Sequence, residues 1–235
     1  MKEREAALAV FVKTPALSPI KTRLAQRIGR ERAETFYRLS LAAVAATMGA
    51  LNELDGIQPY WAVAEDAGLA NTRWQSFPRV HQGNGGLGDR LGHVFAALQH
   101  RHEIVMAIGA DSPQITPEIV REAVGYLQRD RMDEAHVLGR CHDGGFYLVG
   151  TNHALSPETW RDVPYSTSAA ANGLAANLAR QGSIYELARL SDVDLIEDLA
   201  VMKDELDAVA NPSAEQQAIL NWIVATLNDE FPNDE

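Results

Sequence analysis

Three cationic side chains follow the first apolar segment of the chain. Lys13 ends the expected strand Ala6–Lys13, and Lys21 and Arg23 flank Thr22 after a short loop. In an open α/β sheet the loop between the first strand and the next helix binds anions, because backbone N–H groups are free there. Ammonium and guanidinium groups add charge-assisted contacts to phosphate oxygens. This segment therefore predicts a phosphate site for a nucleotide, made by Lys13, Lys21, Thr22 and Arg23. The alternative is a solvated basic turn.

A glycine-rich segment, His81–Leu91, leads into an expected helix. It lacks the G-x-G-x-x-G order of dinucleotide-binding folds and the lysine of a P-loop. Glycines let a backbone approach a flat base closely, and the amide of Gln82 is suited to reading the edge of that base. The segment predicts either a base-binding loop that uses Gln82 or a plain flexible loop.

Carboxylates follow two other segments. Asp111 ends the buried strand Glu103–Asp111, where open α/β sheets bind ligands, and Thr116 can cap the next helix in its place. Asp192 and Asp194 occupy alternate positions, so an extended backbone would point both the same way. Carboxylate oxygens hold Mg²⁺ or Mn²⁺ against phosphate oxygens. We predict a Mg²⁺ or Mn²⁺ site made by Asp111, Asp192 and Asp194.

Asp143 lies in the sequence Asp143-Gly144-Gly145, between the expected strands Ala135–Arg140 and Phe146–Gly150. An Asp-Gly pair commonly forms a hairpin turn, which is a purely structural role. A carboxylate beside a ligand crevice can also accept a proton. Asp143 is therefore the candidate general base, with Asp111 as the other catalytic candidate through its metal.

Alternating strand and helix patterns position these residues. Such alternation predicts parallel strands joined by helical crossovers, and the hairpin around Asp143 adds an antiparallel strand. We expect an α/β fold with a mostly parallel mixed sheet, in a single domain over residues 1–235. The expected strands are Ala6–Lys13, Pro59–Ala64, Arg79–Gln82, Glu103–Asp111, Ala135–Arg140, Phe146–Gly150 and Ser183–Leu187. The expected helices are Arg30–Leu54, Leu87–His100, Pro117–Arg129, one opened by Ser166 and Thr167 that runs to Gln181, one with Glu197 and Asp198 in its first turn, and Ser213–Asn228.

Composition excludes several classes of protein. A chain of 235 residues with 46% hydrophobic content can bury a core without disulfides, and its lone Cys141 cannot form an internal one. No apolar stretch is long enough to cross a bilayer and no export signal is evident, so we expect a cytoplasmic protein without a membrane span. The formal charge of −11, with an acidic end at Asn228–Glu235, argues against a nucleic-acid partner.

Taken in order, six segments resemble one family. They are Lys13-x-Pro15 with Lys21-Thr22-Arg23-Leu24, Gln82-Gly83 with Leu87-Gly88-x-Arg90-Leu91, Gly109-x-Asp111-x-Pro113, Asp143 through Gly150, Ser166-Thr167, and Asp192-Val193-Asp194 with Asp198-Leu199. The chain is similar to a bacterial family labelled glycosyltransferase and associated with arsenosugar biosynthesis. That family has the GT-A fold of nucleotide-diphospho-sugar transferases and is related to 2-phospho-lactate and molybdenum-cofactor guanylyltransferases.

The resemblance implies a three-layer GT-A sandwich and a metal-dependent glycosyltransferase that uses a nucleotide-sugar donor and a small-molecule acceptor. It also implies nucleotide contacts from Gly83 and Arg90. The alternatives are a guanylyltransferase-like nucleotidyltransferase that releases pyrophosphate, and a nucleotide-binding protein without catalysis. Two departures from the family pattern are Leu17-Ser18 in place of Pro-Gly, and Tyr165 in place of Trp. The first removes a residue that tolerates positive φ from the phosphate loop.

Overall fold

The computed structural model of the chain describes residues 5–54, 56–129 and 133–231. The last four residues of the acidic C-terminal segment, 232–235, lie outside this range. The strands are β1 (Ala6–Val12), β2 (Gln58–Val63), β3 (Arg79–His81), β4 (Ile104–Gly109), β5 (Ala135–Arg140), β6 (Phe146–Thr151) and β7 (Ser183–Glu186). The α-helices are α1 (Thr22–Ile28), α2 (Arg30–Leu54), α3 (Leu87–Gln99), α4 (Pro117–Arg129), α5 (Ala170–Leu178), α6 (Asp198–Asp207) and α7 (Ala214–Glu230), and a 3₁₀ helix, η3, spans Pro157–Trp160.

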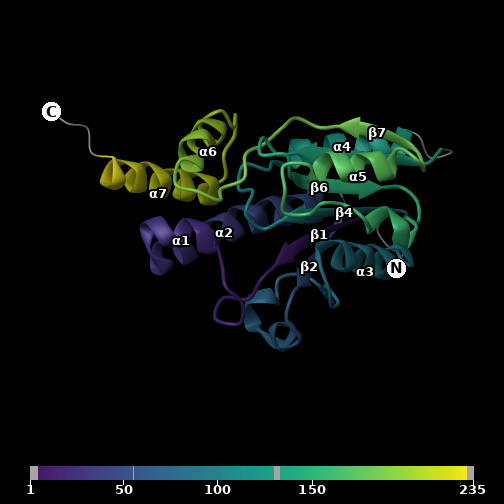
Figure 1. The fold of residues 1–235 in the computed structure, drawn as a ribbon, viewed down its shortest axis with the longest axis horizontal. Helices are drawn as coiled ribbons and strands as arrows, with labels where there is room; N and C mark the ends of the chain where they lie inside the picture. The colour runs from purple at the N-terminus through teal and green to yellow at the C-terminus, as the bar shows by residue number, and fades with distance from the viewer. Residues whose placement is uncertain (1–4, 55, 130–132, 232–235) are drawn as a thin grey trace.

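All seven strands form one sheet in the order β3-β2-β1-β4-β6-β5-β7. Strands β3, β2, β1 and β4 run parallel, and β5 pairs in parallel with β7. Only β6 is reversed among the described strands, since it pairs antiparallel with both β4 and β5. The predicted mixed and mostly parallel sheet is therefore confirmed. All described strands except β6 have their carboxyl ends on the same side of the sheet. The loops that follow these strands therefore lie together there (Figure 1).

Helices cover both faces of this sheet, which gives three layers. One core cluster packs alternate β1 residues such as Leu8 and Val10 against α2 and α4. The other packs the intervening residues, Ala7 and Ala9, against α3 and α5. Side chains of a strand point alternately to opposite faces, so an apolar run buries both faces at once.

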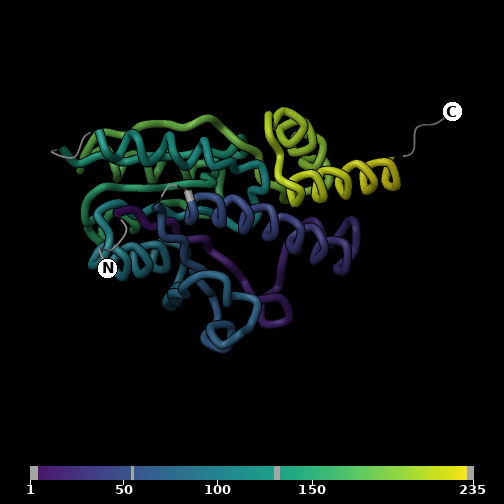
Figure 2. Tube along the Cα trace, turned by 180° about the vertical axis from the view of Figure 1, so that it is seen from behind, coloured from purple at the N-terminus to yellow at the C-terminus, as the bar shows by residue number. Residues whose placement is uncertain are grey.

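A third apolar cluster lies away from the sheet. It joins α1, α6 and α7 to the N-terminal turns of α2, through buried residues such as Leu24, Phe36 and Met202. Figures 1 and 2 show α6 and α7 beside α1 and α2 at one end of the molecule, next to the edge where the strands end. Two segments that flank the candidate site, the start of α1 and the loop before α6, are thus anchored in a common core.

The observed elements differ from the sequence predictions mainly after residue 160. The helix expected to open at Ser166 and Thr167 begins at Ala170, because Ser166 adopts a left-handed backbone conformation, with φ 63°. The Thr167 hydroxyl instead donates to Pro164 O, at 2.7 Å, and accepts the N–H of Ala169. Helix α1 was absent from the expected elements, because its seven residues show too few turns for a periodic pattern.

Candidate functional site

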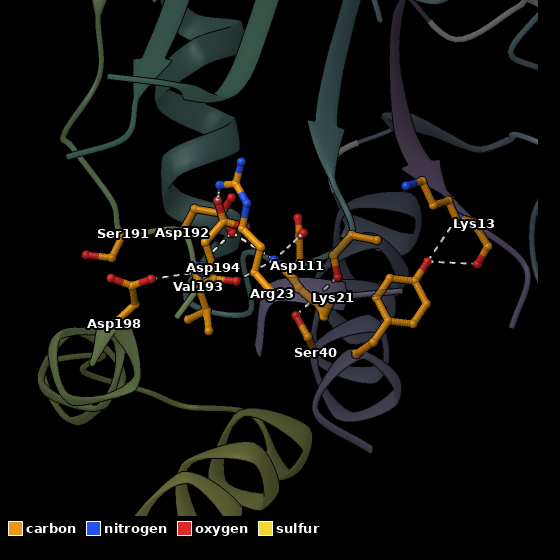
Figure 3. Close-up of polar contacts among 12 residues, drawn as sticks. Lys13, Lys21, Arg23, Ser40, Asp111, Ser191, Asp192, Val193, Asp194 and Asp198 are labelled. Carbon is orange, nitrogen blue, oxygen red and sulfur yellow. Dashed lines mark hydrogen bonds and ion pairs between the residues drawn. The ribbon is translucent and has the colours of Figure 1, made fainter. Parts of the chain in front are cut away.

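Lys21 is the centre of a charged cluster on the side of the sheet where the parallel strands have their carboxyl ends. It caps α1 in a left-handed conformation, with φ 42° and ψ 50°. Its Nζ lies 2.7 Å from Asp111 Oδ2, 3.0 Å from Asp192 Oδ1 and 2.8 Å from the carbonyl oxygen of Val193 (Figure 3). The Lys21 side chain is 7% exposed, whereas each of the two carboxylate side chains is 33% exposed. The ammonium is therefore enclosed, while both carboxylates remain open to an adjoining cavity.

A second ion pair repeats this arrangement two residues further along both segments. Arg23 Nη1 lies 2.6 Å from Asp194 Oδ2, in a pair that is largely exposed. The N–H of Asp194 donates to Asp198 Oδ2 (Figure 3). The N–H of Leu195 donates to the same oxygen, and the two bonds fix the loop at the start of α6. Lys21 and Arg23 of the basic segment thus pair with Asp192 and Asp194 of the acidic segment, respectively.

The cluster holds more negative than positive charge around Lys21, and the pKa values reflect this. Burial lowers the pKa of Lys21, but the charges of Asp111 and Asp192 outweigh it and raise that pKa above its usual value. Burial opposes the charged form of Asp111 too, yet the Lys21 ammonium holds the Asp111 pKa below its usual range. Burial and the charge of Asp111 raise the pKa of Asp192. One ammonium thus contacts two carboxylates whose charges repel each other, an arrangement that a further cation would stabilise.

Glu205 of α6 anchors the loop that carries the acidic segment. Its carboxylate accepts from Ser191 N and from the Ser191 hydroxyl, both at 3.0 Å, and from Gln114 Nε2 at 2.9 Å. Gln114 Nε2 also donates to Ser191 O, at 2.7 Å. Because Gln114 follows β4, this network links the loop after Asp111 to the loop before Asp192. No local sequence signal marks Glu205, since its partners are distant along the chain.

Lys13 lies at the end of β1, on the other side of Asp111 from the acidic segment. The Tyr37 hydroxyl of α2 accepts the N–H of Lys13 and donates to its carbonyl oxygen, each at 3.0 Å. Burial raises the pKa of Tyr37, so this hydroxyl keeps its proton. Lys13, Lys21 and Asp111 line a cavity of about 350 Å³ with Phe11 and Leu87, here named the Lys13 cavity. Tyr37 also lines it and was not foreseen from the sequence.

Gln82 is buried and hydrogen-bonded within the fold. This residue is 4% exposed, and its amide nitrogen donates to Ala62 O at 2.8 Å and to Val12 O at 3.1 Å. Its oxygen accepts from Arg90 Nη1 at 3.1 Å. The Gln82 amide therefore joins β1, β2 and α3 within the fold, which is a structural role. A base contact from Gln82 remains a prediction.

The glycine-rich loop is shaped by its own contacts. Gly83 has φ 79°, a conformation that side chains rarely adopt, and a Cβ there would press on the His93 ring. Arg90 Nε donates to Gly85 O at 3.1 Å, in addition to its bond to Gln82. Both Gly83 and Arg90 thus support the loop, and a nucleotide contact from either remains a prediction.

Asp143 opens onto a larger cavity of about 800 Å³, here named the Asp143 cavity. Asp143 Oδ1 accepts the N–H of Gly145 at 2.8 Å, so the expected hairpin turn does form. Gly144 has φ 92° and packs against the backbone of Ser168, where any Cβ would collide. The lining residues are Arg23, Leu87, Asp143, Gly145, Phe146, Tyr165, Ser166, Thr167, Ser168, Ala170, Asp192, Asp194, Leu195 and Asp198.

Thr22 lies apart from this cluster. It lines a separate groove with residues 16–20 and Arg30, and it lines neither the Lys13 cavity nor the Asp143 cavity. The positive φ expected in this loop falls on Ala16, at 72°, and the N–H groups of Leu17 and Ser18 both donate to Thr14 O. The loop therefore closes without glycine at positions 17 and 18.

A divalent cation suits the donor set, although the described residues hold no group of three His, Cys, Asp or Glu side chains arranged to bind a metal. Mg²⁺ usually takes only one or two protein carboxylates and completes its shell with substrate phosphates and water. Asp111 and Asp192 supply such a pair of hard oxygen ligands, and both are partly open to the cavities. Asp194 is directed to Arg23 instead, so Asp192 is the better partner for Asp111.

The fold is that of nucleotide-diphospho-sugar transferases. The chain superimposes on the crystal structure of a Desulfovibrio desulfuricans G20 protein, provisionally named a nucleotide-diphospho-sugar transferase, with a TM-score of 0.82 and 22% sequence identity. The match covers 96% of this chain and 98% of that one. A 4-diphosphocytidyl-2C-methyl-D-erythritol synthase from Anaerococcus prevotii matches with a TM-score of 0.53 and 10% identity, over 86% of this chain and 96% of the other.

Residues 47–167, just over half of the chain, match the family described as "uncharacterized protein conserved in bacteria (DUF2064)". The chain belongs to this family. No curated protein matches it in sequence. Within residues 5–54, 56–129 and 133–231, no helix is long and apolar enough to span a membrane.

Proposed function

We propose that the protein transfers a glycosyl group from a nucleotide sugar to a small-molecule acceptor, with Mg²⁺ or Mn²⁺ as cofactor. One observation carries this proposal. Lys21 is enclosed between Asp111, which lines the Lys13 cavity, and Asp192, which lines the Asp143 cavity, and Leu87 lines both cavities. A charged cluster between two cavities suits a reaction in which a diphosphate departs from one side and an acceptor enters from the other.

The Lys13 cavity is the proposed site of the nucleotide. Lys13 is exposed, and among the described residues no carboxylate pairs with it, so its ammonium is available to phosphate. Leu87, the first residue of α3, lines this cavity, and a helix N-terminus favours an anion nearby. Phe11 and Leu87 offer apolar surface to a base or a ribose.

Asp111 and Asp192 would hold the metal ion, which neutralises charge on the departing diphosphate when it is bound. The residues of the chain perform the remaining tasks. Lys21 fixes both carboxylates and contributes a positive charge beside the same phosphates. Gln114 and Glu205 hold the backbone on which Asp192 is carried.

Asp143 is the proposed general base. The acceptor hydroxyl oxygen forms a bond to the anomeric carbon of the donor, and the bond between that carbon and the diphosphate oxygen breaks. The nucleoside diphosphate leaves with the electron pair, and the hydroxyl proton passes to Asp143. The Gly145 N–H occupies only one Asp143 oxygen, which leaves the other for the proton.

Nucleotidyl transfer is the second candidate, and the basic Lys-Thr-Arg segment favours it. In that reaction a phosphorylated acceptor attacks a nucleoside triphosphate, and pyrophosphate leaves. The relative from Anaerococcus prevotii and the resemblance to guanylyltransferases support it. Against it, Lys21 and Arg23 are both paired with carboxylates, so few cations remain for a triphosphate. The third candidate, binding without catalysis, loses its main support because the loop at Leu17-Ser18 closes normally.

The experiment identifies the leaving group of the reaction. The protein is incubated with Mg²⁺ or Mn²⁺, a panel of nucleotide sugars and mixed small metabolites, and released nucleoside diphosphate is assayed. A parallel reaction with nucleoside triphosphates and phosphorylated metabolites is assayed for pyrophosphate. Asp111→Asn should abolish release, whereas Asp204→Asn, an exposed aspartate of α6, should not. Acceptor-dependent pyrophosphate that Asp111→Asn abolishes would replace the first proposal with the second.

A further inference from the structure

We propose that the Asp143 cavity selects an acceptor that is neutral or cationic, a hydroxyl or amine compound, and excludes phosphorylated or carboxylated molecules. This inference rests on the proposed function, because it names the class of substrate at the acceptor side of the same site. It comes from the whole lining of the cavity, which combines a preformed shape, an apolar wall and one sign of unpaired charge.

The shape of the cavity is fixed by close backbone contacts. Gly144 packs on the backbone of Ser168, and the N–H of Ala171 donates to Gly144 O at 2.9 Å. Gly88 of α3 packs equally closely on Trp160 O and the Tyr165 ring. The hairpin, the 165–168 loop and α3 are therefore held together before any ligand binds, as is usual for small-molecule sites.

One wall of the cavity is apolar. Leu87 and Leu195 are 42% and 52% exposed, and both line it together with Phe146 and Tyr165. The hydroxyl-bearing residues Ser166–Ser168 lie in the same lining. Apolar surface combined with hydroxyl groups suits a ring or carbon chain that carries hydroxyl groups.

The charge of the lining determines which acceptors are excluded. Four carboxylates line the cavity, those of Asp143, Asp192, Asp194 and Asp198. Among the described lining residues the sole cation is Arg23, which Asp194 already pairs at 2.6 Å. A phosphate or carboxylate would therefore lose its hydration without gaining a free cationic side chain in return, and it would face Asp143. A hydroxyl or ammonium group would instead donate to these carboxylates.

The first test measures the potential in the cavity without needing the acceptor. Ser168→Cys is made in a Cys141→Ala background, and its modification rates by methanethiosulfonate reagents of positive and negative charge are compared. Ser183→Cys, an exposed position on β7, is the matched control. Because surface potentials reach several kT, we expect the cationic reagent to be favoured roughly tenfold at position 168 after normalisation to position 183. Adding Asp143→Asn should reduce this preference several-fold.

A normalised ratio of one or below at Ser168→Cys, or a ratio that Asp143→Asn leaves unchanged, would overturn the proposal. The second test supplies matched neutral, amino and phosphorylated monosaccharides to the donor-turnover assay. Stimulation confined to the phosphorylated members would also overturn it. Titration of a nucleoside diphosphate by calorimetry is run in parallel. If the nucleotide fails to bind, the proposed function fails, whereas the reagent ratio still decides the charge selection of the cavity.

Discussion

The Lys13 cavity and the Asp143 cavity lie on the two sides of the ion pairs of Lys21, with Asp111 in the first lining and Asp192 in the second, and they differ in charge and in construction. The first is lined by Lys13 and Lys21 with a single carboxylate, Asp111, among its described residues, and lies at the ends of β1 and β4. The second is lined by four carboxylates and one paired arginine. Its walls come from the β5–β6 hairpin and from loops before α5 and α6. Adjacent cavities of opposite charge can bind two different reactants side by side with little competition between them.

The two cavities also differ in what holds them. Neighbouring parallel strands fix the Lys13 side, and Gln82 joins two of those strands. The acidic loop of the Asp143 side depends on single side chains, above all Glu205. The shape of the cationic side is therefore fixed by hydrogen bonds between strands, whereas the shape of the acidic side is fixed by hydrogen bonds of single side chains. Four predictions test it.

Among the substitutions at the charged cluster and the loops around it, Lys21→Met should have the largest effect, because it removes the ammonium that pairs with a carboxylate of each cavity. Leaving two partly buried carboxylates unpaired should lower the free energy of unfolding by about 3 kcal/mol. Urea unfolding measures this. Mg²⁺ should restore more stability to Lys21→Met than to the wild type, since a cation then relieves the same repulsion.

The matched control for that variant is Lys203→Met, whose exposed pairs with Asp204 and Asp207 should contribute less than about 1 kcal/mol. If the two lysine variants lost the same free energy of unfolding, Lys21 would not be the residue that stabilises the charged cluster. An equal effect of Mg²⁺ on wild type and Lys21→Met would argue against a metal at Asp111 and Asp192.

Glu205→Gln should weaken the acidic side selectively. An amide cannot accept all the hydrogen bonds that the carboxylate accepts from Ser191 and Gln114, so we expect a loss of about 2 kcal/mol. Hydrogen exchange should rise in residues 190–195 and remain unchanged in β1 and β2. Glu122→Gln, an exposed glutamate of α4, is the control. If hydrogen exchange rose equally in residues 190–195 and in β1 and β2, the acidic and cationic sides would not be stabilised independently.

Gln82→Ala should weaken the cationic side without changing base preference. The carbonyl groups of Val12 and Ala62 lose the bonds that the Gln82 amide donates to them, which should cost about 1.5 kcal/mol of stability, although Val12 O keeps the N–H of Ala64. Relative affinities for nucleoside diphosphates of different bases, measured by calorimetry, should keep the wild-type order. A change in that order would mean that Gln82 contacts the base after all.

Acid should loosen the half of the sheet that carries the Asp143 hairpin. Burial and the neighbouring His153 lower the pKa of His136, on β5, to about 4. The unfolded chain takes up this proton near pH 6.5, so the native state binds fewer protons between the two values. Stability should therefore fall as the pH falls from about 6.5 to 4, by up to about 1.4 kcal/mol per pH unit for this group.

Urea unfolding over that pH range checks the slope. His136→Leu should flatten it, while His100→Leu, at the exposed end of α3, should leave it as in the wild type. An unchanged slope in His136→Leu would assign the acid sensitivity to other groups.

Residue types and spacing alone predicted many of the helices and strands. The bounds expected for Arg30–Leu54 and Pro117–Arg129 agree with α2 and α4, and the hairpin around Asp143 was expected as an antiparallel element. These segments have strong local signals: long helical periodicity, a proline at the first helical position, and an Asp-Gly turn. Gln82 illustrates the opposite case. Its neighbourhood in the chain suggests a ligand-binding loop, but its partners lie 20 and 70 residues away.

The sequence by itself determined the alternating strand and helix pattern, and hence which charged residues come at strand ends. Only the tertiary structure decided how those charges combine. Lys21 and Asp192 are separated by 171 positions, and their pairing depends on α1 and α6 packing into one apolar cluster. Local periodicity contains no information about such contacts, because they arise when distant segments bury surface together. For that reason the sequence predicted cations and carboxylates as two separate sets, and the structure shows them as ion pairs whose carboxylates line two cavities.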